Sequence, residues 1–149
     1  DYYASRGLGD VYKRQEQMAD TIGRFLAEQG VKKIRIHDTS KTHPSYIIND
    51  IFRYKGVILG SCAYNGGIFP TMETLLCELE NMGIKNHLLA YFGNKTWGGG
   101  AIPRLKAFAE KMKWEVVAEP NEALGAMKSS DIEQCKAIAQ AMAEKIKKS

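Results

Sequence analysis

Cysteine and histidine are scarce in this sequence, which has only three of each among 149 residues. No two cysteines form a CxxC pair, and no histidine stands at metal-ligand spacing from another or from a cluster of carboxylates. The odd cysteine count argues against a disulfide framework, and reduced thiols fit a cytoplasmic protein. We expect Cys77 and Cys135 to be small buried groups on apolar helix faces, and the three histidines to be structural or solvated.

Long apolar runs and concentrated charge are also lacking. No run approaches the length of a transmembrane helix, and residues 1–14 hold no apolar stretch typical of a signal peptide. The net charge of +4 is mild, and the lysines gathered over 145–148 suit the end of a helix. Without a basic stripe interleaved with aromatic residues, nucleic-acid binding is not expected. Neither a Gly-x-Ser-x-Gly elbow nor a cysteine–histidine pairing indicates nucleophilic catalysis.

The chain length suits one domain, but residues 1–15 do not match the rest of the chain. They contain no apolar run longer than two residues, so we expect a non-native or disordered tail and a domain over 16–149. The pair Gly7-x-Gly9 lacks both a third glycine and a preceding strand, and is only a very weak dinucleotide-loop signal.

From residue 16 onward, helical and strand patterns alternate, which predicts a parallel sheet with helices on both faces. An apolar strand ahead of the first helix, expected at the centre of such a sheet, is missing. We therefore expect a sheet of four strands. The predicted elements are a helix over 16–29, a strand over 31–37 near a sheet edge, a helix from Pro44, a strand over 56–60, a helix over 70–82, a strand over 87–92, a helix over 102–112, a strand over 114–119 and a helix from Ser130 or Asp131.

The loops after two predicted strands are where a parallel sheet of this kind binds ligands. The first loop reads Ser61-Cys62-Ala63-Tyr64-Asn65-Gly66-Gly67. Its glycines let backbone amides approach a flat ligand, Tyr64 offers a ring for stacking, and Ser61 and Asn65 offer hydrogen bonds. The alternative is a tight turn from strand to helix with a buried tyrosine.

The second loop reads Gly93-Asn94-Lys95-Thr96-Trp97-Gly98-Gly99-Gly100. Three consecutive glycines are costly to order, and loops run over the surface, where a tryptophan is hard to explain as core. Trp97 as a plain packing residue stays the alternative. Because the two loops follow neighbouring strands, Tyr64 and Trp97 are expected to flank one planar ring.

Residues from about Gln17 to Lys148 resemble the flavodoxin domain at the C-terminus of flavodiiron proteins. The resemblance is carried by GVILGSCAYNGGIFPTMETLL and FGNKTWGGGAIPRLKAFAEKMKWEVV, where the family usually reads GSPTYNGGIFP and GSYGWGGGA. It implies a flavodoxin-like three-layer α/β/α sandwich with a parallel sheet and FMN as cofactor. The residues it assigns to the cofactor are Ser61, Cys62, Ala63, Tyr64, Asn65, Gly66, Gly67, Gly93, Asn94, Lys95, Thr96, Trp97 and Gly98.

The chain departs from the family at three places. Cys62 and Ala63 replace proline and threonine, and Asn94-Lys95-Thr96 replaces Ser-Tyr-Gly and adds a positive charge. The first strand and its hydroxyl-rich phosphate loop are missing, with Tyr12–Glu16 in their place.

The resemblance implies an electron-transfer domain of a flavodiiron oxygen or nitric oxide reductase. Rubredoxin or a flavin reductase would be the electron donor, and a diiron domain outside this chain the acceptor, in a head-to-tail homodimer. The alternatives are a free-standing flavodoxin or FMN-dependent quinone reductase, and a flavodoxin-like protein-interaction module without flavin. No catalytic or metal-binding residue is expected in this chain.

Overall fold

Helices and strands alternate along most of the chain in the computed structural model, which describes residues 9–37, 41–64, 67–68, 70–95, 101–118, 120–124 and 129–148. The elements are, in order, α1 (Gly9–Glu28), α2 (Pro44–Arg53), β1 (Gly56–Tyr64), β2 (Gly67–Ile68), α3 (Pro70–Met82), β3 (Leu88–Lys95), α4 (Ala101–Met112), β4 (Glu115–Val116), β5 (Asn121–Leu124) and α5 (Ser129–Lys148).

The described sheet is built around β1 and β3. These two strands pair in parallel from Gly56 opposite Leu88 to Cys62 opposite Asn94. On the far side of β3 lie β4 and β5, both parallel to it, and β2 forms a short antiparallel pair with the end of β1. The long parallel pair requires crossover connections, and α3 provides the one between β1 and β3.

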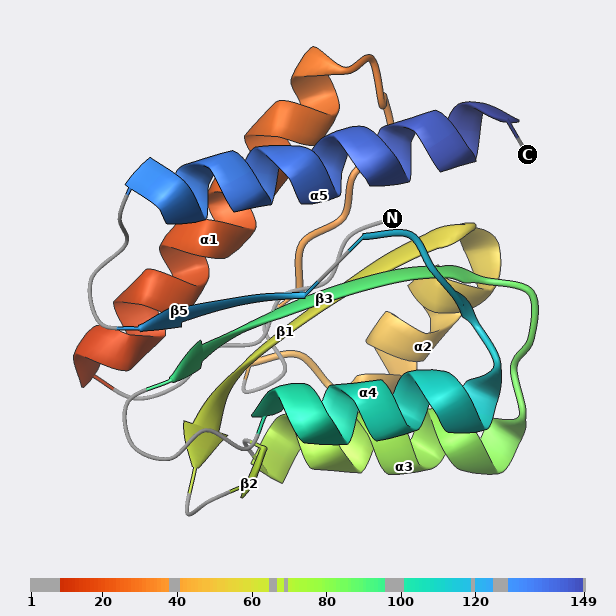
Figure 1. The fold of residues 1–149 in the computed structure, drawn as a ribbon. Helices are drawn as coiled ribbons and strands as arrows, with labels where there is room; N and C mark the ends of the chain where they lie inside the picture. The colour runs from red at the N-terminus through yellow and green to blue at the C-terminus, as the bar shows by residue number, and fades with distance from the viewer. Residues whose placement is uncertain are drawn as a thin grey trace.

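Helices cover both faces of this sheet, α1 and α5 on one and α2, α3 and α4 on the other (Figure 1). Successive strand residues alternate between the two layers, as the pleat dictates. Ile58 and Phe92 pack under α1 and α5, whereas Leu59 and Tyr91 pack against the opposite helices. The two apolar cores confirm the predicted three-layer α/β/α sandwich with a parallel sheet.

Local signals account for two of the helix ends. Gly30 adopts a φ of +91°, and the Val31 amide donates to the Leu26 carbonyl at 3.1 Å, so α1 ends in the left-handed cap expected at a glycine. Pro44 begins α2, as predicted, and the Ser45 amide donates to Nδ1 of His43 at 3.2 Å. The helix then buries Ile47, Ile48 and Ile51.

The predicted strand over 31–37 is wrong, because these residues form no regular secondary structure. A strand needs a neighbour for its backbone groups, and the described part of the chain places no strand beside this segment. The apolar side chains still serve the core, since Val31 and Ile34 pack against the α1–α5 layer. His37 ties the segment to α2 through a 2.5 Å contact between its Nε2 and the Asp50 carboxylate.

Of the predicted strand over 114–119, only Glu115–Val116 forms a strand, β4, and a strand that the sequence analysis did not predict, β5, begins beyond it at Asn121 on the same edge of β3. From Leu88 to Phe92 β3 advances by four residues, while its partner advances by six between Glu115 and Asn121. The register of β4 and β5 on β3 is therefore offset by two residues, which no alternation pattern predicts.

Two further expectations differ from the structure. Cys135 is fully buried as predicted, but Cys77 is exposed and its thiol donates to the Glu73 carboxylate. The leucines of α3 fill the core face without it. Helix α1 starts at Gly9, ahead of the predicted start at residue 16, and the domain boundary at residue 15 stays a prediction. Within the described residues, no helix is long and apolar enough to cross a membrane.

Candidate functional site

The carboxyl ends of β1 and β3 lie side by side. Ser61 stands opposite Gly93, and Cys62 opposite Asn94, in the parallel register. Both Ser61 and Gly93 are buried. The two predicted ligand loops therefore start at one level on one edge of the sheet, which confirms the expected juxtaposition of the strand ends.

The first loop contains a short hairpin. Tyr64 pairs with Gly67 and Ala63 with Ile68 in antiparallel register, so the strand turns back on itself before α3 begins. From the sequence, this stretch was expected only as a glycine-rich loop. An Asn-Gly dipeptide between two strand residues, as at 65–66, is a strong hairpin signal and was the available clue.

Two helices begin directly after the loops, α3 at Pro70 and α4 at Ala101. Helix α4 packs against both β1 and β2, so the helix that follows the second loop contacts the hairpin of the first. Figure 1 shows the first residues of these helices, and those of α1 and α5, at the end of the molecule toward which the strand arrows point. Helix N-termini carry partial positive charge, which favours an electron-rich or anionic ligand at this edge.

The structure covers the thirteen predicted cofactor residues unevenly. Ser61 and Gly93 are described in full and are buried. The backbone of Cys62, Ala63, Tyr64, Gly67, Asn94 and Lys95 forms strand. Asn65, Gly66, Thr96, Trp97 and Gly98 lie outside the described residues. The flanking of one ring by Tyr64 and Trp97 also lies outside them and stays a prediction.

An ion-pair cluster joins the two helices behind the loops. Arg104 of α4 donates from Nε to the Glu73 carboxylate at 2.8 Å and from Nη2 to Glu80 at 2.7 Å, and Lys111 lies 3.3 Å from Glu80. We call these four residues the Arg104 cluster. It was not predicted from the sequence. Both acids and both bases are spaced by seven residues, which places each pair on one helix face and was the available signal.

Proton affinities in the Arg104 cluster follow from its contacts. The hydrogen bond from Arg104 holds the pKa of Glu73 below its ordinary value, and the pKa of Arg104 itself is raised by the same bond. The Glu73 carboxylate raises the pKa of the neighbouring Cys77 thiol. At neutral pH the pair is therefore fully charged and the thiol protonated.

Of the histidines, His87 has a clear structural role. It is buried, and its ring nitrogens lie 2.6 Å from the Ile51 carbonyl and 3.0 Å from the Lys85 carbonyl. The ring also stacks on Trp114 with centroids 4.9 Å apart. His43 is exposed and contacts Ser45. These placements agree with the expected structural or solvated histidines.

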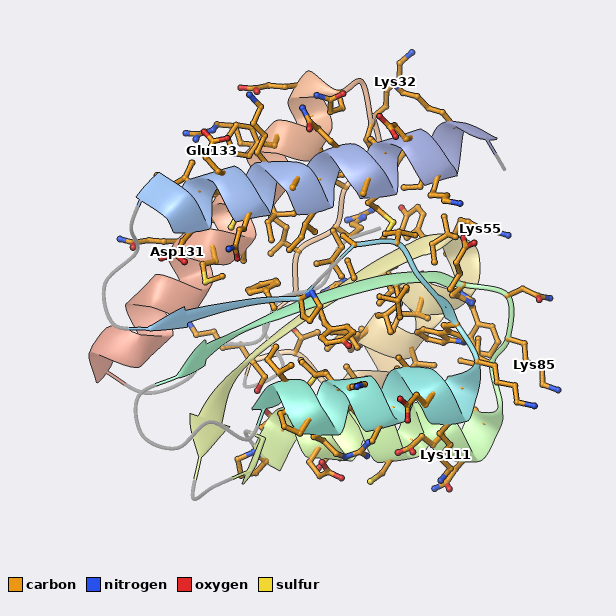
Figure 2. The ribbon with its side chains drawn as sticks, viewed as in Figure 1. Lys32, Lys55, Lys85, Lys111, Asp131 and Glu133 are labelled. Atoms are coloured by element: carbon orange, nitrogen blue, oxygen red, sulfur yellow. The ribbon has the colours of Figure 1, made fainter. Side chains whose placement is uncertain are left out.

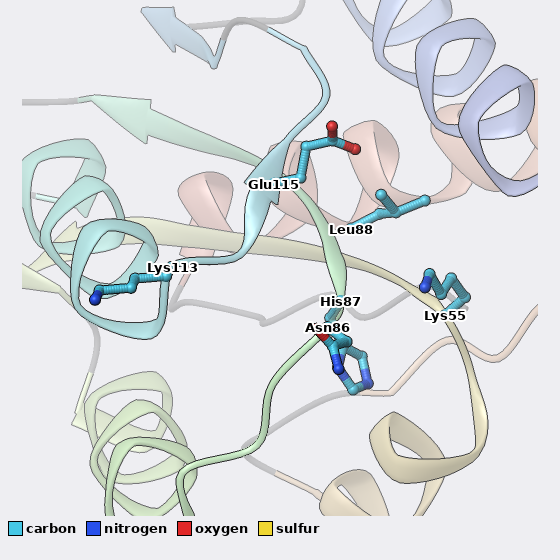
Figure 3. A pocket seen from close by; sticks show the side chains of 6 residues that line it. All are labelled: Lys55, Asn86, His87, Leu88, Lys113 and Glu115. Atoms are coloured by element: carbon cyan, nitrogen blue, oxygen red, sulfur yellow. The ribbon is translucent and has the colours of Figure 1, made fainter. Parts of the chain in front are cut away.

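The opposite end of the sheet carries several lysines, and Figure 2 shows Lys55, Lys85 and Lys111 there, away from Asp131 and Glu133. A hollow of about 360 Å³ at this end is lined by Lys55, Asn86, His87, Leu88, Lys113 and Glu115. Its charged side chains point in different directions and do not converge on one position (Figure 3). Lys111 lies in the last turn of α4, where its charge compensates the helix dipole, so we assign this end a structural role.

Comparison with known proteins identifies the domain type. No protein-family model matches the sequence. The anaerobic nitric oxide reductase flavorubredoxin of Escherichia coli is 28% identical over 100 residues, which cover 66% of this chain and 21% of that protein. The chain is similar to part of that protein, and its fold is flavodoxin-like. It spans about a fifth of the length of the curated relatives that it matches.

Solved structures support the same fold. The rubredoxin oxygen:oxidoreductase of the anaerobe Desulfovibrio gigas superposes with a TM-score of 0.89 at 24% identity, over 99% of this chain and 35% of that one. Flavodoxin 1 of Bacillus cereus superposes with a TM-score of 0.81 at 18% identity, over 96% of both chains. The flavodoxin-like domain is thus found both within larger redox proteins and as a protein by itself.

Proposed function

We propose that this flavodoxin-like domain binds FMN at the edge formed by the carboxyl ends of β1 and β3 and uses it for electron transfer. The observation that carries the proposal is the register of Ser61 opposite Gly93, which brings two glycine-rich loops together beside the first turns of α3 and α4. Bound there, FMN supplies the redox chemistry, taking up electrons and passing them on.

The residues at this edge fit the flavin ring better than its phosphate. In this proposal, peptide groups of both loops would line the flat ring, Tyr64 and Trp97 would flank it and Lys95 would add positive charge. The phosphate is less well provided for. Residues 12–16, in the place of the hydroxyl-rich loop, are helical backbone within α1. We therefore propose that the ring, rather than the phosphate, supplies most of the affinity.

Within a longer protein, the domain would serve a flavodiiron oxygen or nitric oxide reductase in the cytoplasm. Rubredoxin or a flavin reductase would donate electrons, and a diiron domain of the partner in a head-to-tail homodimer would accept them. The support is the flavorubredoxin of Escherichia coli, of which this chain matches a fifth, and the longer Desulfovibrio gigas oxidoreductase.

A second candidate is a free-standing flavodoxin or FMN-dependent quinone reductase. It is favoured by the mutual coverage of 96% with the Bacillus cereus flavodoxin. Electron acceptors separate the two: transfer from the reduced domain to a flavodiiron diiron domain supports the first candidate, and direct reduction of a quinone supports the second.

The test is a titration of the flavin-free chain with FMN, followed by quenching of flavin fluorescence. We expect saturable binding that Trp97→Ala weakens about tenfold, the equivalent of about 1.4 kcal/mol for a lost stacking partner. Riboflavin, which lacks the phosphate, should bind with an affinity within about tenfold of that of FMN.

A version of the chain preceded by an apolar strand and a hydroxyl-rich loop is the matched control. Stronger FMN binding by that version, with riboflavin unchanged, identifies the phosphate site as the missing part. If neither version quenches flavin fluorescence, the domain is a flavodoxin-like interaction module and the proposal is wrong.

A further inference from the structure

The Glu73–Arg104 pair holds the two loop-bearing helices together close to their starts. Glu73 is the fourth residue of α3 and Arg104 the fourth residue of α4. Arg104 Nε lies 2.8 Å and 3.1 Å from the two carboxylate oxygens of Glu73. Since α3 follows the first loop and α4 the second, this contact fixes the separation of the two helix starts from which the loops emerge.

The other contacts of the Arg104 cluster lie further from the loops. Glu80 is the eleventh residue of α3 and Lys111 the eleventh of α4. At the far ends of the same two helices, Trp114 Nε1 donates to the Ile84 carbonyl at 2.9 Å. An ion pair near the loops thus joins α3 and α4 themselves, and a buried hydrogen bond joins the segments that follow their far ends.

Stability alone does not account well for the Glu73 contact. The Glu73 side chain is 40% exposed, whereas that of Glu80 is 9% exposed. An ion pair to a carboxylate so exposed contributes little to folding. Its geometry still restricts where α4 can lie on the hairpin of the first loop, against which α4 packs.

We propose that Arg104, through Glu73, is a positioning residue for FMN, because it sets the separation of the starts of α3 and α4, the helices that follow the two loops. The inference rests on the proposed FMN site. A preorganised binding site loses affinity when the elements that form it are no longer held in place, because the free energy of binding must then include the cost of ordering these elements.

The test measures FMN affinity of Arg104→Gln and Glu73→Gln by flavin fluorescence. Both variants remove the Glu73–Arg104 pair and change the charge in opposite directions, and Arg104→Gln also removes the contact with Glu80. A positioning role therefore weakens binding in both, by up to about fivefold each. A long-range charge effect on the flavin would instead shift the two variants in opposite directions. The double variant should lose no more than either single one, since the pair acts as a unit.

Trp114→Phe is the matched control, because it removes the contact between α3 and α4 at the end away from the loops. It should lower the stability at least as much as the ion-pair variants, yet change FMN affinity by less than about twofold. In a Trp114→Phe background, Trp97 is the only tryptophan of the sequence. Adding Arg104→Gln should then shift the emission of Trp97 in the absence of flavin.

The outcomes separate this inference from the function on which it rests. Wild-type binding with unchanged affinity in Arg104→Gln and Glu73→Gln overturns the positioning role and leaves the FMN site intact. Equal weakening by Trp114→Phe overturns it as well, because general loss of stability is then the cause. Absence of FMN binding by the wild-type chain refutes the proposed function and the positioning role together.

Discussion

Replacing His87 with leucine tests how the amino-terminal end of the sheet is held together. His87 is 8% exposed, and its ring nitrogens face the carbonyls of Ile51 and Lys85. Ile51 lies in the last turn of α2, where carbonyls have no partner within the helix. The imidazole therefore provides a hydrogen bond that the helix itself cannot supply, from a residue 36 positions further along the chain.

The size of the effect follows from these contacts. Leucine has a similar volume but no polar atom, so a buried carbonyl loses its donor, which costs about 1–3 kcal/mol. Loss of the ring stack on Trp114 adds about 1 kcal/mol. We expect His87→Leu to lower the free energy of unfolding by about 3 kcal/mol, which corresponds to a fall in Tm of roughly 6–12 °C for a domain of this size.

The assay is urea unfolding of the flavin-free chain followed by far-UV circular dichroism, with thermal unfolding as a second measurement. His43→Leu is the control, because His43 is exposed and only caps the start of α2, which is worth about 1 kcal/mol. A loss below about 1 kcal/mol for His87→Leu, or an equal loss for both variants, would refute the reasoning.

Three further outcomes are expected. If Lys95 lies within about 10 Å of the flavin, Lys95→Gln should lower the midpoint potential of the flavin by roughly 30 mV, because a positive charge favours the reduced form. An unchanged flavin potential in a spectroelectrochemical titration contradicts this. Glu73 has a pKa below its ordinary value of 4.5, so its stabilising pair is complete above pH 4.5 and is lost as the pH falls through the lowered value. The difference in unfolding free energy between wild type and Glu73→Gln, about 1 kcal/mol or less, should therefore shrink as the pH falls below 4.5, and a difference that is constant with pH in urea melts would argue against the pair. Gly56→Ala places a Cβ 2.7 Å from Met142 Sδ and 3.1 Å from Ile146 Cδ1. It should therefore lower the free energy of unfolding in urea by about 1–2 kcal/mol. A Tm equal to that of wild type would show that the α5 side chains adjust freely.

Strong local patterns predicted much of this fold. The apolar run at 56–60 and the run at 87–92 became the central parallel pair, and Pro44 and Pro70 began helices where expected. The segment over 31–37 shows the limit of such patterns. The alternation of apolar and polar residues indicates which side chains face the core. A strand also requires a second strand to pair with, and the presence of that second strand depends on residues elsewhere in the chain.

The site was predictable in position but not in its supporting contacts. Apolar strands followed by glycine-rich loops located the edge of the sheet, because parallel strands end at the same side. The Glu73–Arg104 contact joins residues 31 positions apart. Their pairing depends on how α3 and α4 pack, which neither helix pattern contains by itself.

The two-residue offset between β4 and β5 has a consequence for how this molecule behaves at high concentration. On this side of β3, the border of the sheet consists of β4, with two paired residues, and β5, with four. Pro120, which has no amide hydrogen, lies between them in the chain. A continuous intermolecular sheet cannot propagate along a border broken in this way. The irregularity thus makes this margin of the described sheet a poor template for pairing with a strand of another molecule.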